Sequence, residues 1–300
     1  MFVMREHFGR MCKCKQCGYP IYVTPDSVSP PMDPRDLSNL RCFSEEKRVP
    51  VTWRGGDLLM DKYEVRGTLG NGGMGVVYQV FHRGWGIDLA VKSPLPRLLP
   101  NRHAIELFEQ ECETWICMAP HPNTVCCYYV LRLGGIPRVF VEYIKGHSLS
   151  HKIASKTIYE GGHRKALQRV LDMSIQFAWG LQHAHEEGLV HQDVKPSNAL
   201  VSVESRLKVT DFGVARALMT EDTGKGDLKY QAVGTPTHRS PDYMHPDGVT
   251  TKSDMWSWAM CVMEMFAGGR FWDKGDTAPE SLRALKKHGA HYSEIPPMPD

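Results

Sequence analysis

The sequence lacks the features that would point to a membrane or a nucleic acid. No apolar run approaches the roughly eighteen residues that a membrane-spanning helix needs, and the start, MFVMREHFGRMCKCKQ, has no apolar core like that of a signal peptide. No charge of one sign prevails, because 36 basic residues face 34 acidic ones and the formal net charge is +2. We therefore expect no nucleic acid and no membrane as the principal partner, and we place the protein in the cytoplasm.

The cysteine pattern lacks the spacing of a secreted disulfide framework. Nine cysteines are present, but Cys126 and Cys127 are adjacent, and Cys112, Cys117 and Cys261 lie in segments whose apolar pattern predicts helices or core-facing strands. Thiols in such places are usually reduced and packed in the core. We expect most of the cysteines to contribute to packing.

Residues 1–23 are the exception, because they hold a small cysteine cluster. A CxxC pair followed by glycine is typical of one knuckle of a zinc ribbon, and a third cysteine precedes it; the three are Cys12, Cys14 and Cys17. A structural zinc ion needs four ligands, so His7 or Cys42 would have to supply the fourth. The alternatives are a half-ribbon whose other half precedes this chain and a cysteine-bearing tail without metal.

Composition divides the rest of the chain into a linker and one large domain. Residues 24–57 contain five prolines among Ser, Asp and Arg, which is typical of a linker that cannot form a core. Residues 58–300 carry the apolar patterns of a folded domain, and 42% of the whole chain is hydrophobic, which suffices for a sizeable core. The sequence shows no internal repeat and no heptad run.

One stretch, HQDVKPSNALVSVESRLKVTDFG at residues 191–213, gathers the groups that phosphoryl transfer requires. Asp193 and Asn198 lie five residues apart in a predicted loop, and a predicted hairpin then leads to Asp211. Transfer from a nucleotide needs a carboxylate at the attacking hydroxyl, an ammonium near the phosphoryl group and oxygen ligands for magnesium. With Lys195 as the ammonium, this stretch supplies the whole set.

The same stretch resembles the catalytic loop and the magnesium loop of protein kinases, with HQD in place of the usual HRD, then KPSN and an intact DFG. The resemblance implies that Asp193 is the catalytic base and that Lys195 steadies the γ-phosphate. It also implies that Asn198 and Asp211 hold Mg²⁺.

The resemblance implies the α+β, two-lobed protein kinase fold. Residues 58–145 would form a small antiparallel sheet with one helix, and residues 146–300 a mostly helical lobe. Members of the family continue for two or three more helices, so we expect the C-terminal helices to be missing and this lobe to be truncated. Apolar periodicity predicts the individual elements: strands within 63–84, around 89–91 and at 125–133, 137–143, 199–202 and 207–210, and helices at 101–118, 165–187, 251–267 and 279–288.

A glycine-rich turn, LGNGGMGVVY, separates the first two predicted strands. Its GxGxxG spacing also occurs in dinucleotide-binding turns, but those are followed by a helix, whereas a β-rich run follows here. A backbone that closes over phosphates must approach without Cβ atoms and offer amide donors. By the resemblance, the loop contacts ATP through Leu69, Gly70, Asn71, Gly72, Gly73, Met74, Gly75 and Val77.

Lys92, in IDLAVKSP, corresponds to the phosphate-contacting lysine of the family's VAIK motif. That lysine needs a carboxylate from the following helix to hold its charge on the α- and β-phosphates. We choose Glu111, because FEQE resembles the spacing in bacterial members, and Glu109 and Glu113 remain rivals. The adenine slot that the resemblance implies consists of Val77, Ala90, Val141, Leu200 and the backbone of Glu142 and Ile144.

Further positions bear on substrate and regulation. The tripeptide Gly-Thr-Pro at residues 234–236 and Lys195 resemble the corresponding positions of serine/threonine kinases. The resemblance implies that Thr235 forms a hydrogen bond with Asp193. Asp254 matches the residue that braces the catalytic loop in protein kinases. Asp242 occupies the position of the family's usual glutamate, and its side chain is shorter by one methylene group. Gln192 replaces the arginine that receives a loop phosphate in many relatives, so we expect phosphorylation at Thr220, Thr223, Thr235 or Thr237 to have a weak effect on activity.

We therefore predict an ATP- and Mg²⁺-dependent serine/threonine kinase that acts on protein hydroxyls. The alternatives are a nucleotide-binding scaffold or inactive kinase fragment, and a small-molecule phosphotransferase, which shares the aspartate and asparagine arrangement. The protein substrate, the upstream signal and the oligomeric state leave no trace in the sequence.

Overall fold

The computed structural model describes residues 11–13, 20–22, 49–72, 75–96, 99, 102–212, 235–244, 249–290 and 293–299. The chain divides into two compact units. The first comprises residues 1–120 and 126–143, and the second comprises residues 121–125 and 144–300. Each unit has its own core and is described by itself.

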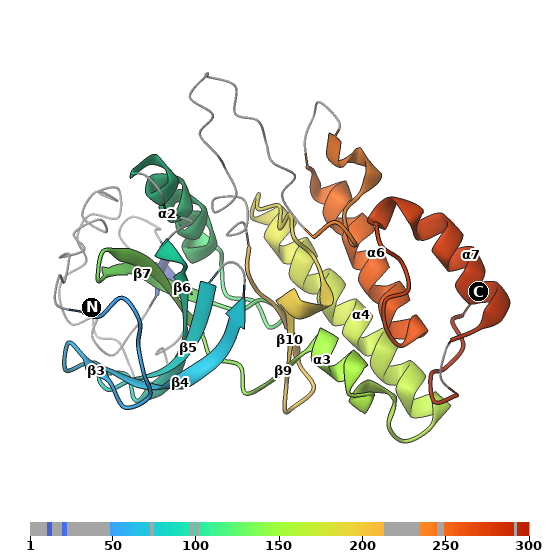
Figure 1. Cartoon of the computed structure of the whole chain (residues 1–300), viewed down its shortest axis with the longest axis horizontal. Coiled ribbons are helices and arrows are strands. Elements are labelled where there is room, and N and C mark those ends of the chain that lie inside the picture. Colours follow the sequence, from blue (N-terminus) through green and yellow to red (C-terminus); the bar gives the residue numbers. More distant parts are fainter. Residues whose placement is uncertain are drawn as a thin grey trace. The chain divides into compact units, whose positions relative to one another are not determined.

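A six-stranded antiparallel sheet forms the body of the first unit, in the order β3-β4-β5-β6-β8-β7 (Figure 1). The glycine-rich sequence lies where β4 turns into β5, as expected. Lys92 lies in β6 between two cross-strand neighbours, Val77 on β5 and Val139 on β8. The strands are β3 (Leu58–Leu59), β4 (Tyr63–Gly72), β5 (Gly75–His82), β6 (Ile87–Pro94), β7 (Cys127–Leu133) and β8 (Ile136–Glu142). A separate two-stranded sheet, β1 (Met11–Lys13) and β2 (Pro20–Tyr22), precedes them.

The core of this unit includes residues that the sequence assigned to the linker, and here the prediction was wrong. Val49 and Trp53 are buried against the sheet, although they lie within residues 24–57. Composition did not indicate that Trp53 is buried, because the side chain that holds it is far away in the sequence. The guanidinium of Arg138 lies 3.9 Å from the centroid of the Trp53 ring. Residues 49–57 therefore belong to the folded unit.

Helix α2 (Arg102–Cys117) is the helix predicted at 101–118, and it packs against β7. Three residues on one face of this helix are almost fully buried: Phe108, Cys112 and Trp115. They recur at intervals of four and three residues, which is the spacing of an amphipathic helix. This face directs α2 towards the sheet.

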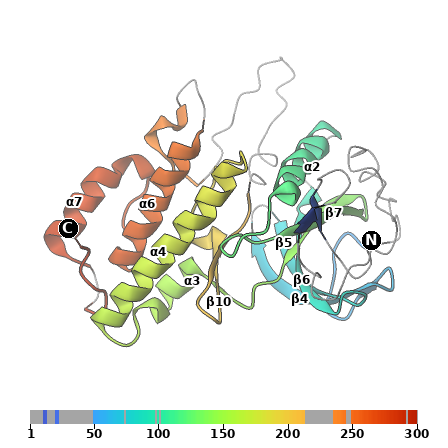
Figure 2. The ribbon, with the colours of Figure 1, turned by 180° about the vertical axis from the view of Figure 1, so that it is seen from behind.

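The second unit is mostly helical, and α4 and α6 lie side by side at its centre (Figure 2). Gly180 of α4 permits a close approach, since a Cβ there would lie 2.4 Å from the carbonyl oxygen of Asn123. Gly188, with φ of 79°, ends the helical segment as predicted. The helices are α3 (Leu149–Ala154), α4 (His163–Glu186), α6 (Thr251–Ala267) and α7 (Ala278–His288).

A small three-stranded sheet, in the order β11-β10-β9, carries the catalytic stretch. Its strands are β9 (Gly146–Ser148), β10 (Ala199–Ser202) and β11 (Leu207–Val209), and the last two form the predicted hairpin. The loop between α4 and β10 contains Asp193 and Asn198, and β11 leads directly to Asp211. Among the described residues, no helix is long and apolar enough to cross a membrane.

Candidate active site

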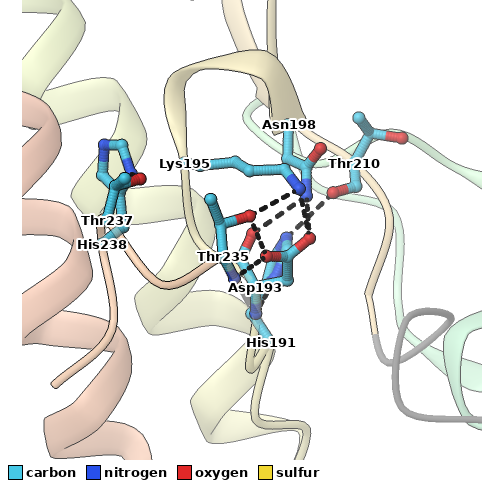
Figure 3. Close-up of polar contacts among 8 residues, drawn as sticks. All are labelled: His191, Asp193, Lys195, Asn198, Thr210, Thr235, Thr237 and His238. Carbon is cyan, nitrogen blue, oxygen red and sulfur yellow. Dashed lines mark hydrogen bonds and ion pairs between the residues drawn. The ribbon is translucent and has the colours of Figure 1, made fainter. Parts of the chain in front are cut away.

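The carboxylate of Asp193 is held by four hydrogen bonds from three residues of the second unit (Figure 3). Oδ2 accepts from Nζ of Lys195 at 2.6 Å and from Nδ2 of Asn198 at 3.2 Å. Oδ1 accepts from the backbone N–H and the hydroxyl of Thr235, both at 2.9 Å. Asp193 is only 5% exposed, so these bonds fix the direction in which the carboxylate points.

Thr235 joins two segments that are forty residues apart in the sequence. Its hydroxyl donates to Asp193 and accepts from Nζ of Lys195 at 2.9 Å. The sequence predicted that Thr235 would tie its segment to the catalytic loop, and the structure has this geometry. A carboxylate, an ammonium and a hydroxyl therefore form one connected cluster.

Asn198 and Asp211 offer oxygen atoms suited to a hard cation. The amide nitrogen of Asn198 donates to the backbone oxygen of Asp193 at 2.9 Å, which turns the amide oxygen away from that residue (Figure 3). Asp211 follows β11 with φ of 73°, and its Oδ1 accepts from the hydroxyl of Thr210 at 3.0 Å. Magnesium prefers carboxylate and amide oxygens, so this pair fits the ion that the sequence implied.

His191 is a neutral support beneath the catalytic loop. Its Nδ1 accepts from the backbone N–H of Asp193 at 3.3 Å, so Nε2 carries the proton and donates to the backbone oxygen of Thr210 at 2.9 Å. Burial lowers the pKa of His191, while the charges of Asp254 and Asp193 act in the opposite direction. The ring connects the loop to the end of β11 without adding a charge.

Asp254 braces the backbone of this loop from the first turn of α6, as the sequence predicted. It is 1% exposed, and it accepts from the backbone N–H groups of His191 at 2.7 Å and Gln192 at 2.9 Å. Nε2 of His185, on α4, lies 2.9 Å from the same carboxylate. The sequence analysis did not assign this role to His185, because its partner lies 69 residues further along the chain.

A second buried cluster holds the segment that follows Thr235, and the sequence analysis missed it. His238 is 4% exposed; its ring nitrogens contact the hydroxyl of Thr237 at 3.0 Å and the carboxylate of Glu264 at 3.1 Å. Trp272 donates from Nε1 to the backbone oxygen of Thr237 at 2.8 Å. Residues 235–240 are thus anchored to α6 and to the segment after it. Asp242 lies next in the chain, and its backbone N–H donates to the Ser240 hydroxyl.

In the first unit, the structure removes one rival for the partner of Lys92. Glu109 makes a two-point ion pair with Arg132, with both N–O distances at 2.7 Å. Its carboxylate is therefore already engaged by an arginine. The side chain of Glu111 lies outside the described residues, and its pairing with Lys92 stays a prediction.

The glycine-rich turn shows two different reasons for glycine. A Cβ at Gly75 would lie 2.3 Å from the backbone oxygen of Ser93, so the sheet itself excludes a side chain there. At Gly70 and Gly72, a Cβ would meet no described atom within 4 Å. Neither residue has positive φ, so among the described residues neither a close contact nor backbone strain requires glycine there. Open space above the backbone is what a bound phosphate chain would fill. Gly73 and Met74 lie outside the described residues.

The predicted adenine residues of the first unit lie on neighbouring strands. Ala90 on β6 pairs with Val141 on β8, and both are buried. Glu142 and Cys126 form two hydrogen bonds. The backbone oxygen of Cys126 accepts from the backbone N–H of Glu142 at 2.9 Å, and the backbone N–H of Cys126 donates to the Glu142 carboxylate at 3.2 Å. Val77 and Leu69 lie on β5 and β4. Ile144 and Leu200 belong to the second unit, and a slot completed by them stays a prediction.

The zinc prediction concerns residues that the structure largely does not describe. Cys12 lies in β1, whereas the other proposed ligands, His7, Cys14, Cys17 and Cys42, lie outside the described residues. Within the described ranges, no group of three or more His, Cys, Asp and Glu side chains is arranged to hold a metal ion. A zinc site at the amino terminus has no structural support.

Comparison with known proteins gives consistent results. A family profile described as protein kinase domain matches residues 63–295. A probable serine/threonine-protein kinase of Streptomyces coelicolor is 30% identical over 210 residues, which is 68% of this chain and 30% of that protein. Another, of Clostridium acetobutylicum, is 30% identical over 240 residues, which is 80% of this chain and 35% of that protein. The chain thus spans about a third of the length of these relatives.

Among solved structures, the kinase domain of Mycobacterium tuberculosis PknI is similar, with a TM-score of 0.59 and 23% sequence identity. The similarity covers 74% of this chain and 78% of that one. At this level of identity, the comparison informs about the fold. It confirms the α+β architecture that the sequence implied.

Proposed function

Because this chain belongs to the protein kinase domain family, we propose that it transfers the γ-phosphoryl group of ATP to serine and threonine hydroxyls of proteins. The cluster around Asp193 is the observation that carries this proposal. A buried carboxylate is oriented by Lys195, Asn198 and Thr235, with Asp211 at the end of the adjoining strand. Phosphoryl transfer depends mainly on such positioning and on charge stabilisation.

Phosphoryl transfer to a protein hydroxyl exchanges one bond to the γ-phosphorus for another. The oxygen of a substrate hydroxyl bonds to the γ-phosphorus, the bond from that phosphorus to the β–γ bridging oxygen breaks, and ADP leaves. The hydroxyl proton passes to the carboxylate of Asp193. Lys195, 2.6 Å from that carboxylate, stabilises the negative charge on the transferred group.

Asn198 and Asp211 would hold Mg²⁺, which neutralises charge on the phosphate oxygens when bound. The turned amide of Asn198 supports this assignment, because it directs an oxygen away from Asp193. The open space above Gly70 and Gly72 supports a phosphate site at the glycine-rich turn. Lys92 would contact the α- and β-phosphates from β6.

Preference for serine and threonine in proteins rests on two supports. Thr235 bridges Asp193 and Lys195, in keeping with the serine/threonine type of loop that the sequence resembles. The curated relatives quoted above are described as probable serine/threonine-protein kinases. Their identities, near 30%, make the substrate class of this chain a proposal.

The test is transfer of labelled phosphate from ATP to a generic basic protein, followed by phosphoamino acid analysis. We expect label on serine or threonine, and we expect it to disappear with EDTA and in D211N. Binding of ATP without transfer would instead favour a nucleotide-binding scaffold. Label on a small-molecule hydroxyl in preference to protein would favour a small-molecule phosphotransferase.

A further inference from the structure

Lys92 lies beside an aromatic ring that no sequence motif assigns to it. Nζ of Lys92, on β6, is 5.6 Å from the centroid of the Trp115 ring, on the last turn of α2. A cation within about 6 Å of an indole face is attracted by the ring's electron density, and tryptophan is the most effective of the aromatic residues. Both residues belong to the first unit.

The side chains around this contact are largely buried. Trp115 and Cys112 are fully buried on α2, and Cys127 is 4% exposed on β7. Burial raises the pKa of the Cys127 thiol well above its usual value, the thiols of Cys112 and Cys126 add to this, and the charge of Lys92 acts in the opposite direction. Lys92 itself is half-buried, so its ammonium loses part of its hydration beside the buried indole. Attraction to a ring is stronger in such surroundings than at an exposed site.

Two positions of α2, residues 111 and 115, lie on one face of the helix. Residue 111 lies one turn before Trp115, so both positions face the same side of α2. Glu109 is committed to Arg132. Trp115 lies on this face with its ring 5.6 Å from the ammonium.

We propose that Trp115 is a positioning residue for Lys92: its indole face holds the ammonium at a fixed distance from α2, so that the lysine meets the nucleotide phosphates. The proposal rests on the proposed kinase function and names a further residue for it. The indole acts through Lys92. A displacement of α2 would then displace the lysine as well.

The first measurement tests the contact without reference to activity. In the chain labelled with ¹³C at lysine Cε, the Lys92 signal is assigned by its loss in K92R. The ring current of Trp115 should shift the Lys92 Hε resonance upfield, and W115L should remove that shift while the other lysine signals stay in place. A Lys92 signal that is the same in W115L and in the parent chain would overturn the proposal.

The second measurement separates the ring's electron density from its volume, which also guards against variants that fail to fold. Tryptophan analogues with one to four ring fluorines are incorporated at position 115, since they keep the shape while weakening attraction to a cation. We expect kcat/KM for ATP, and ATP affinity measured by calorimetry, to fall stepwise by a total of about two- to tenfold. The matched control is the same series at Trp179, which is 54% exposed on α4, where no trend is expected.

The outcomes distinguish the two proposals. A flat series at position 115 would overturn the role of Trp115, whatever the activity of the chain. If the parent chain transfers no phosphate, the proposed function fails, while the affinity series and the lysine spectrum still decide whether the indole positions Lys92.

Discussion

The two units of this protein hold charged side chains by different means. In the helical unit, Asp193 and Asp254 each accept several short hydrogen bonds from N–H and hydroxyl donors. In the sheet unit, Lys92 and Arg138 lie over the rings of Trp115 and Trp53. Hydrogen bonds weaken steeply with distance and angle, whereas attraction to a ring face varies slowly. The helical unit therefore relies on directional hydrogen bonds for its carboxylates, and the sheet unit adds a less directional ring contact to the other contacts of its cations.

The largest expected effect concerns the brace of the catalytic loop. D254N places an amide N–H against backbone donors and removes a buried carboxylate that three groups contact. We expect urea unfolding to show a loss of about 3 kcal/mol, with a fall in the transfer rate. D172N is the control, because Asp172 is an exposed carboxylate on α4. Equal stabilities of the two variants would contradict the brace.

The corresponding test in the sheet unit is R138M. Arg138 is fully buried and donates to the backbone oxygens of Leu133, Pro50 and Val51 at 3.3, 3.4 and 2.5 Å. Methionine fills the space but removes the guanidinium donor from these oxygens, and the Pro50 oxygen still accepts from Nε1 of Trp53, so we expect a loss of about 2 kcal/mol.

The same variant should expose residues 49–53 to proteolysis. R138K should lie between R138M and the parent, because lysine keeps the charge but lacks the planar group that stacks on Trp53. The exposed Arg83 supplies a matched control, R83M. If R138M resists unfolding and protease as well as R83M does, these residues are not anchored by Arg138.

Stability should also depend on pH through His191. Because burial lowers the pKa of His191, the unfolded chain binds a proton near pH 6.5 that the folded chain does not bind. Stability is therefore complete above about pH 6.5 and falls below it, by at most about 1.4 kcal/mol per pH unit for this group. Urea unfolding between pH 5.5 and 7.5 measures the slope, and H191N should reduce it. An unchanged slope in H191N would mean that other titrating groups cause the pH dependence of stability.

The smallest expected effect concerns His238. H238L removes the contacts to Thr237 and Glu264, and we expect the KM for a peptide substrate to rise about fivefold, which corresponds to one lost hydrogen bond. The KM for ATP should stay the same. H238Q keeps a donor towards Glu264 and should restore part of the difference. A rise in both KM values, without rescue, would indicate a general loss of folding.

The sequence predicted the parts of this protein in which neighbouring residues carry the chemistry. Asp193, Lys195 and Asn198 lie within six residues, so one loop brings them together, and the hairpin to Asp211 follows from local apolar alternation. The long helices also followed from their periodicity. In contrast, His238 meets Glu264 across 26 residues, and no local pattern records such a meeting.

The errors have the same physical origin. Trp53 appeared to lie in a proline-containing linker, because its partner Arg138 is 85 residues away in the sequence. From the sequence, Glu109 was an alternative to Glu111 as the partner of Lys92, but its carboxylate forms a two-point ion pair with Arg132. Tertiary contacts of cations with rings and carboxylates leave almost no trace in residue spacing.

The most direct test of the account is the rate of phosphoryl transfer in D193N at saturating ATP and Mg²⁺. Asparagine keeps the size of the side chain and cannot take the hydroxyl proton. We predict a fall in kcat of about a hundredfold or more, measured where circular dichroism shows the variant to be folded, with ATP affinity close to that of the parent chain. Transfer by D193N at the parent rate would contradict the account.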